Sequence, residues 1–254
     1  NASNRQAPDW WENLTKVPEG VCCDGLIRYS LLSIMAFVQK QRNGSHVEWP
    51  LSFPLPKGVV PPSSVTITKN TSPSPTYTSI PNIIHLMTKT ISKKTSPGFQ
   101  HWFWSDLACQ ELVRNNFDPR IYKCFINLVP GPCRTDLARL CILYVFGGVY
   151  INANMSVQSN VATWLSSDHL FVVNENTTLH GTKELYLHGG LIGAVPQHKL
   201  MATTIRRILY NVSNPEGIVR KHLNVTGSGV LGTAYIDCGL PLDGITAYVD
   251  HEET

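Results

Sequence analysis

The chain has 254 residues, of which 43% are hydrophobic and only 15% charged, and its net charge is +3. A chain of this length and hydrophobicity can bury a core, which excludes a wholly disordered protein. No run of Lys and Arg exceeds two residues, which excludes the dense basic stripe that a nucleic-acid-binding protein needs.

The first 79 residues are predicted to be additions to a larger domain. Residues 1–49 form an N-terminal helical extension, in which the apolar stretch 26–38 has 13 residues and contains Arg28. A membrane-spanning helix needs about 20 residues, so we expect no membrane span in this chain. Residues 50–79 hold seven prolines among many Ser and Thr residues. Because proline interrupts helices, this composition predicts an extended stem or a strap on the domain surface.

Residues 80–254 are predicted to form one α/β layered domain, because strand patterns alternate with helix patterns. The segment 107–115 is predicted to be a helix, with Ser105 and Asp106 as capping residues. The segment 134–146 is apolar nearly all round, so we expect a buried helix that ends at Gly147 and Gly148. Another helix is predicted at 201–211. Strands are predicted at 80–85, 100–104, 149–151, 170–173 and 190–195.

Potential N-glycosylation sites are frequent in this chain. Eight Asn-X-Ser/Thr sequons occur, whereas chance predicts about three for this composition. Glycans can hydrate a surface that carries few charges, so we expect a protein of the secretory pathway lumen (Golgi) or of the extracellular surface. A Ser/Thr-rich chain with fortuitous spacing is the alternative. The expected glycosylation sites are Asn1, Asn13, Asn43, Asn70, Asn176, Asn211 and Asn224, and the eighth sequon begins at Asn154.

The seven cysteines permit up to three disulfides with one thiol left over, and their pairing stays open. Cys141 lies inside an apolar run, so it is predicted to be a buried small hydrophobic residue. No C-x-x-C pair occurs, so a zinc site is not expected.

The segment 134–154 carries the main functional signal. Asp136 and Arg139 are three residues apart, so they share one face of a helix whose neighbouring residues are apolar. Charges in such a helix must either pair with each other or face a polar ligand at the rim of the domain. Taken alone, the spacing favours a plain ion pair.

The wider pattern resembles the DxD-type glycosyltransferases, which include α-mannosyltransferases, α1,4-glycosyltransferases and glucosylating toxins. Members of that group carry an R-x-D-x-x-R helix, then Gly-Gly-x-Tyr, then a strand that ends in Asp-x-Asp. Arg134, Asp136, Arg139 and the run from Gly147 to Tyr150 match this pattern. The segments 80–85, 103–106 and 226–229 resemble the group's opening strand, its L-W-D-D stretch and its late T-G-P-G turn. The run 227–232 also matches the G-x-G-x-x-G of dinucleotide sites, but it follows no clear strand, so we interpret it as that turn.

The resemblance implies a GT-A domain, which is a Rossmann-like nucleotide-sugar-binding fold. It implies retaining transfer of a hexose from a UDP- or GDP-sugar to a glycan or glycolipid acceptor. Asp136 and Arg139 are then the catalytic-site residues, which hold the donor sugar. The implied substrate-binding residues are His85, Arg134, Gly148, Tyr150, Asn152, Gly190, Thr226 and Gly227.

The chain departs from the pattern at the metal site, because Asn152 and Asn154 stand at the two DxD positions. An asparagine offers a neutral oxygen, so Mn²⁺ or Mg²⁺ is expected to bind weakly or not at all. A transferase would then need Arg139, Arg134 or Lys199 to carry the charge of the phosphates. The alternative is a catalytically inactive glycosyltransferase-fold protein that serves as a glycosylated surface, structural or interaction component and has protein partners.

The two hypotheses share one expected geometry. Asn152 and Asn154 are predicted at a strand end beside the C-terminus of the 134–146 helix or its following loop. Asp136 is predicted to point into the same cleft. An open cleft lined by Arg139 would favour the transferase, whereas a cleft filled by residues 50–79 or a glycan on Asn154 would favour the inactive protein.

Overall fold

The computed structural model describes residues 55, 59–68, 79–87, 98–128, 131–152, 155, 161–163, 165, 170–174, 185–213, 222–241 and 245–247. The predicted extension 1–49 and most of the predicted stem lie outside these residues. The sequons at Asn211 and Asn224 begin within the described residues. The other six, including the one at Asn154, begin outside them.

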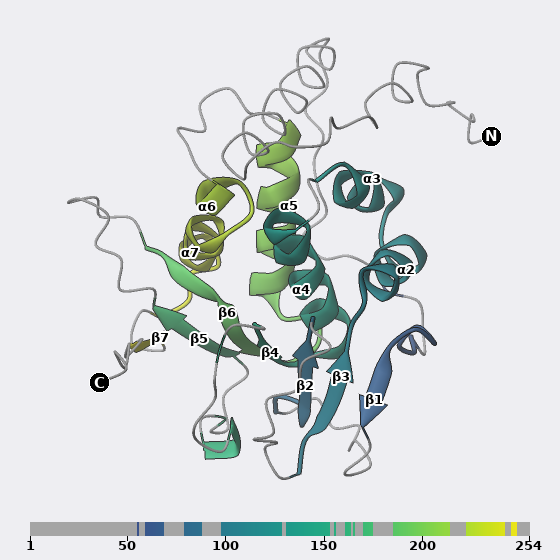
Figure 1. The fold of residues 1–254 in the computed structure, drawn as a ribbon. Helices are drawn as coiled ribbons and strands as arrows, with labels where there is room; N and C mark the ends of the chain where they lie inside the picture. The colour runs from purple at the N-terminus through teal and green to yellow at the C-terminus, as the bar shows by residue number, and fades with distance from the viewer. Residues whose placement is uncertain are drawn as a thin grey trace, which may run out of the picture.

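One mixed sheet organises the fold. Its strands are β1 (Thr66–Thr68), β2 (Ile83–Leu86), β3 (Gln100–Phe103), β4 (Gly148–Ile151), β5 (Leu170–Asn174), β6 (Leu187–Ala194) and β7 (Ile245–Ala247). Their spatial order is β1-β3-β2-β4-β6-β5-β7 (Figure 1). β2 lies parallel to β3 and β4, and β5 lies parallel to β7, whereas the remaining neighbours are antiparallel. β4 therefore has a parallel neighbour on one side and an antiparallel neighbour on the other.

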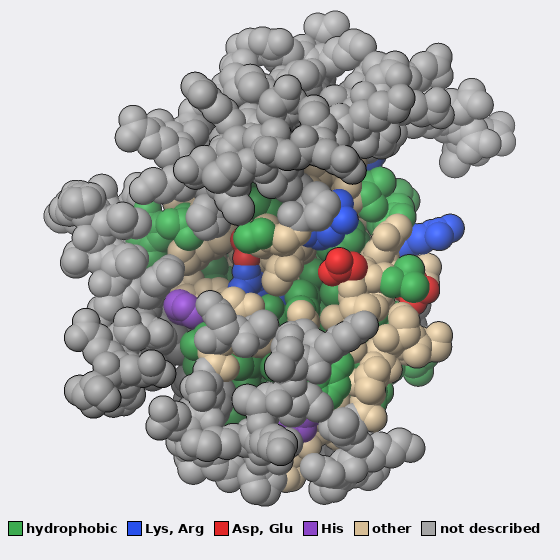
Figure 2. Space-filling model, viewed as in Figure 1, with side chains coloured by type: hydrophobic (Ala, Val, Ile, Leu, Met, Phe, Trp, Pro, Cys, Tyr) green, Lys and Arg blue, Asp and Glu red, His purple; other side chains and the backbone are tan. Residues whose placement is uncertain are grey.

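The helices lie together on one side of this sheet in Figure 1. They are α2 (Asp106–Asn116), α3 (Pro119–Asn127), α4 (Pro132–Phe146), α5 (Lys199–Ser213), α6 (His222–Val225) and α7 (Ser228–Asp237), and a 3-10 turn, η2, spans Val161–Thr163. On the face seen in Figure 2, the described part shows only scattered charged side chains among hydrophobic and neutral polar ones. The predicted α/β class is confirmed.

The local signals explain two of the helix starts. The Ser105 hydroxyl accepts a hydrogen bond from the N–H of Ala108 at 3.1 Å and caps α2, as predicted. Asp118 caps α3, and Pro119 occupies its first turn, where a missing N–H costs nothing. α3 was not predicted from the sequence, although this Asp-Pro pair is a usable start signal.

The buried helix α4 is the centre of the core, and every residue from 136 to 145 is buried. This confirms the prediction that a helix without a polar face is enclosed by the protein. Cys141 is 0% exposed, as expected for a small hydrophobic residue in that position.

The two glycines after α4 let the chain reverse direction. Gly147 and Gly148 have φ angles of +62° and +93°, which side chains of L-residues rarely adopt. A Cβ on Gly148 would lie 2.6 Å from the carbonyl oxygen of Ile83. From Arg139 to Gly147 the helix rises about 12 Å, and from Gly148 to Asn152 the strand runs back about 13 Å. The end of β4 is thereby returned to the level of Arg139.

Two segments differ from the sequence predictions. Part of the predicted stem is an edge strand, because β1 pairs antiparallel with β3. The predicted turn at 226–229 is only partly a turn, since α7 begins at Ser228. Gly232 lies inside that helix, where a Cβ would overlap the carbonyl oxygen of Leu185, so the glycine permits close packing against the chain that enters β6. This pattern match therefore reflects helix packing.

Two further findings concern the cysteines and the membrane. All five cysteines of the described part are free thiols, so the predicted disulfides are not found there; these residues are Cys109, Cys124, Cys133, Cys141 and Cys238. Among the described helices, none has the length and apolar character needed to cross a membrane.

Candidate functional site

Asp136 and Arg139 form an ion pair on α4. Their residues are only 5% and 9% exposed, respectively. The prediction that they share one helix face is correct. The expected orientation of Asp136 is not, because its carboxylate is directed at the guanidinium of Arg139 rather than at an open cleft.

The second carboxylate oxygen of Asp136 binds a residue that is distant in the sequence. The hydroxyl of Thr226 donates to Asp136 Oδ2 at 2.8 Å, in a buried contact. Thr226 is followed by Gly227, which is the N-cap residue of α7. This hydrogen bond therefore holds the start of α7 against α4 and brings the predicted site residue Thr226 to the ion pair, with Gly227 next to it in the chain.

Arg139 connects the ion pair to the sheet. Its Nη1 donates to the carbonyl oxygen of Gly189 in β6. Its guanidinium carbon also lies 5.4 Å from the centre of the Tyr150 ring, within the range of a cation–π contact. Tyr150 is 0% exposed, and burial raises the pKa of its hydroxyl. The phenol is therefore neutral near pH 7.

Asn152 follows β4 directly and joins the same group of residues. Its N–H donates to the carbonyl oxygen of Gly190 at 2.8 Å, and its Oδ1 lies 3.5 Å from the hydroxyl of Tyr150. The predicted strand-end position is correct, but the predicted place beside the C-terminus of the helix is wrong. Because β4 runs back along α4, Asn152 lies level with Arg139.

These contacts join six of the predicted site residues into one group, which we name the α4–β4 cluster. Its predicted members are Asp136, Arg139, Tyr150, Asn152, Gly190 and Thr226. Gly189 belongs to the cluster as well and was missed. The signal for it was the His-Gly-Gly sequence at the start of an apolar strand, since a Cβ on Gly189 would lie 3.1 Å from Arg139 Nη1.

The cluster does not fit a divalent cation. Both carboxylate oxygens of Asp136 are taken by protein donors, and Asn152 offers a neutral amide oxygen. Within the described ranges, no group of three His, Cys, Asp or Glu side chains could hold a metal ion. Mn²⁺ and Mg²⁺ require charged oxygen ligands for tight binding, so no chemical step is assigned to a metal.

His85 has a structural role at the turn before β4 and is the register partner of Tyr150 in the sheet, and its predicted place near a nucleotide stays a prediction. The side chain is fully buried, its Nε2 lies 2.7 Å from the carbonyl oxygen of Gly147, and its Nδ1 accepts from Trp104 Nε1 at 3.1 Å. Burial lowers the pKa of His85 to about 4, so the ring is neutral and donates through Nε2. It fixes the turn that begins β4.

Three more predicted residues have other roles. Arg134 donates to the carbonyl oxygens of Ile126 and Leu128, both at 2.9 Å, and so closes the end of α3. Gly148 belongs to the buried turn before β4. Lys199 donates to the carbonyl oxygen of Cys238 at 2.9 Å. Arg139, Arg134 and Lys199 were predicted to carry the charge of the phosphates. Of these three, Arg139 belongs to the α4–β4 cluster, whereas the contacts given above for Arg134 and Lys199 lie elsewhere.

Most of the α4–β4 cluster lies in the part of the chain that matches a known family. Residues 81–171 match the family model described as "Glycosyltransferase sugar-binding region containing DXD motif". The matched range contains Asp136, Arg139, Tyr150 and Asn152. The match confirms the predicted resemblance to DxD-containing glycosyltransferases, and the mixed sheet with its helices confirms the predicted α/β class.

Individual relatives are distant. An uncharacterized glycosyltransferase, L373, of Acanthamoeba polyphaga mimivirus is 24% identical over 132 residues, which cover 49% of this chain and 50% of the relative. The chain thus spans about half the length of that curated relative. Among solved structures, the PaToxG glycosyltransferase has 14% sequence identity and a TM-score of 0.38, over 84% of this chain and 76% of the other.

Proposed function

We propose that this chain, which matches the sugar-binding region of glycosyltransferases over residues 81–171, transfers a hexose from a UDP- or GDP-sugar to a glycan or glycolipid acceptor with retention of configuration. The α4–β4 cluster is the observation that carries the proposal. It lies at the carboxyl end of β4, where the neighbouring strands change from parallel to antiparallel. Ligands of α/β sheets bind at such edges.

Asp136 and Arg139 are suited to hold the hydroxyl groups of a sugar. A guanidinium has five N–H donors, and the contacts to Asp136 and Gly189 use its two terminal nitrogens. The carboxylate keeps further lone pairs beyond those used by Arg139 and Thr226. A donor sugar therefore binds by adding to these contacts or by replacing the bond between the two side chains.

The site must above all stabilise the negative charge that develops on the leaving group. Departure of a nucleoside diphosphate develops negative charge, which preorganised cations and N–H donors can stabilise. Asn152 supplies no charge, so Arg139 is the group that serves this purpose, and transfer depends weakly or not at all on Mn²⁺ or Mg²⁺. This limits the expected rate, because a neutral site stabilises the leaving group less than a metal site does.

A catalytically inactive protein is the second candidate, and one observation favours it. Asp136 and Arg139 satisfy each other and are almost entirely buried, as in a structural ion pair. Such a chain would keep the fold as a glycosylated surface or interaction component, and its partners would be proteins rather than nucleotide sugars.

Calorimetric titration with UDP- and GDP-sugars, with and without Mn²⁺, separates the two candidates. The transferase predicts binding that Arg139→Gln weakens by at least about tenfold, the value of one charge-assisted hydrogen bond. Arg120→Gln is the matched control, because Arg120 is paired with Asp118 on the exposed start of α3. If no nucleotide sugar binds the native protein, the transferase proposal is wrong.

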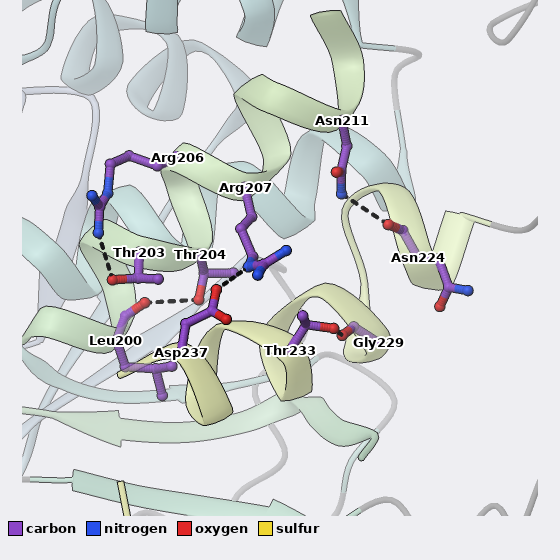
Figure 3. A network of polar contacts seen from close by, with 10 residues as sticks. All are labelled: Leu200, Thr203, Thr204, Arg206, Arg207, Asn211, Asn224, Gly229, Thr233 and Asp237. Atoms are coloured by element: carbon purple, nitrogen blue, oxygen red, sulfur yellow. Dashed lines mark hydrogen bonds and ion pairs between the residues drawn. The ribbon is translucent and has the colours of Figure 1, made fainter. Parts of the chain in front are cut away.

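Passage through the secretory pathway is also part of the proposal, and the eight sequons support it. Within the described part, Asn211 Nδ2 donates to the carbonyl oxygen of Asn224 at 2.9 Å (Figure 3). The sequon at Asn224 ends at Thr226, whose hydroxyl is bonded to Asp136. A glycan on Asn224 would therefore be attached before this region folds. Mass spectrometry of protein from a secreting eukaryotic host, before and after amidase deglycosylation, tests occupancy at each sequon.

A further inference from the structure

A surface groove lies on the exposed faces of α5 and α7. It has a volume of about 510 Å³ and is lined by Thr203, Arg206, Arg207 and Tyr210 of α5 and by Asp237 at the end of α7. Figure 3 shows how Thr203, Arg206, Arg207 and Asp237 lie relative to one another. None of these five residues belongs to the α4–β4 cluster. Binding sites for small molecules span about 300–1,000 Å³, so the groove is large enough for one or two sugar rings but small for a protein interface.

The groove has an excess of positive charge. Its lining contains two arginines and one aspartate, which gives a net charge of +1. Arg207 pairs with Asp237, and both side chains are about a third exposed. Within the described part of the chain, no carboxylate is seen to pair with Arg206: its Nη2 donates to the hydroxyl of Thr203 at 2.8 Å, and its Nε is buried without a hydrogen-bond partner. An anionic group that meets the guanidinium from the groove would offset its charge.

An aromatic ring borders these polar groups. Tyr210 is 56% exposed, so much of this large aromatic side chain is accessible to a ligand, whereas aromatic side chains are more often buried. A flat ring can pack against the C–H face of a sugar, while Asp237 can accept bonds from sugar hydroxyls and Thr203 can both donate and accept them. The guanidinium of Arg206 suits a carboxylate, to which arginine binds through two parallel hydrogen bonds.

We propose that this α5–α7 groove is an ancillary binding site for a carbohydrate that carries a carboxylate, such as a uronic acid unit of a glycan. The site is separate from the α4–β4 cluster because the two lie at opposite ends of α7. Thr226, just before α7, contacts Asp136, whereas Asp237 is the last residue of α7. Ten helical residues span about 15 Å, so a glycan in the groove leaves the cluster free. The proposal does not depend on transferase activity.

Isothermal titration of the whole chain tests the site. The probe is a tetrasaccharide of alternating glucuronic acid and N-acetylglucosamine, and the neutral comparison is a tetrasaccharide of N-acetylglucosamine. We expect the acidic probe to bind at least about tenfold more tightly than the neutral one, because the neutral one lacks the charge-assisted contact. Arg206→Gln and Tyr210→Ala should each weaken the acidic probe by about tenfold. Arg120→Gln, which removes an arginine from α3, should have no effect.

Three outcomes would overturn the proposal. The first is equal affinity for the acidic and neutral probes. The second is unchanged affinity in Arg206→Gln and Tyr210→Ala, once circular dichroism has verified that both variants are folded. The third is equally tight binding of inorganic sulfate, which would indicate a simple anion site. Titration with nucleotide sugars is a separate measurement, so failure of the groove and failure of the proposed transferase activity are distinguishable.

Discussion

The buried His85 predicts a specific loss of stability in mild acid. In the unfolded chain the imidazole has its ordinary pKa of 6.5, whereas in the folded protein burial lowers the pKa to about 4. As the pH falls below 6.5, protons bind the unfolded chain first, and the folded state is disfavoured. The stabilisation is therefore complete well above pH 6.5, falls progressively as the pH drops from 6.5 to about 4, and is fully lost below that.

The size of this effect follows from the two pKa values. The gap between 6.5 and about 4 corresponds to about 3 kcal/mol in the free energy of unfolding. Most of it is already lost at pH 5, where we expect the contribution to be about 2 kcal/mol smaller than at pH 7. Protonation would also deprive the Nδ1 atom of its bond from Trp104, because imidazolium has no acceptor.

Urea unfolding of the native protein and of His85→Gln, at pH 7 and at pH 5, measures this contribution. Glutamine keeps one donor and one acceptor but does not titrate in this range, so the variant should lose about 2 kcal/mol less between the two pH values. His101, whose pKa is also lowered by burial, is present in both proteins and cancels in the difference. If the two proteins lose the same stability, His85 is not held neutral by burial, and its assignment as a structural residue is wrong.

Three further predictions concern the α4–β4 cluster and the turn before it. Asp136→Asn should cost about 3–5 kcal/mol in urea unfolding, because it leaves a buried guanidinium without its partner; a cost below about 1 kcal/mol would show that the pair is not structural. Asn152→Asp combined with Asn154→Asp should raise Mn²⁺ affinity at least about tenfold in calorimetry by restoring two carboxylates, and unchanged affinity would contradict the assignment of a degenerate metal site. Gly148→Ala should lower the free energy of unfolding by at least about 2 kcal/mol more than Gly98→Ala in urea unfolding. Both glycines have φ above +80°, but only a Cβ on Gly148 would lie within 3 Å of a backbone atom, the carbonyl oxygen of Ile83. Equal losses would refute the argument from close packing.

Hydrophobic patterning was sufficient to predict the elements that surround the site. The apolar 134–146 segment, the glycine pair after it and the strand ending before Asn152 all appear at the predicted places, with ends shifted by up to two residues. These features depend on local composition and on backbone conformations that only glycine adopts readily. The ion pair between Asp136 and Arg139 was also accessible, because helical spacing alone brings the two side chains together.

The remaining site contacts depend on tertiary structure. The bond from Thr226 to Asp136 joins residues 90 positions apart, and no local pattern contains that information. His85 and Arg134 matched the family pattern yet serve the turn and the end of α3, because a motif records which residues occur and not which atoms they contact. Each was assigned a ligand role from its position in the motif, whereas its hydrogen-bond partners show a structural one.

Charge balance determines how the cluster can act on a donor. Asp136 and Arg139 neutralise each other, and Asn152 is uncharged, so these three residues together present no net charge to a ligand. A nucleoside diphosphate would bring negative charge to a region of low dielectric, where an uncompensated charge is costly. Arg139 offsets that cost most fully by exchanging its bond to Asp136 for one to the ligand, and Thr226 then remains to satisfy the carboxylate. When binding takes this route, donor binding and the breaking of the ion pair are one coupled event, so a variant that weakens the pair without removing Arg139 should bind the diphosphate more tightly while folding less stably.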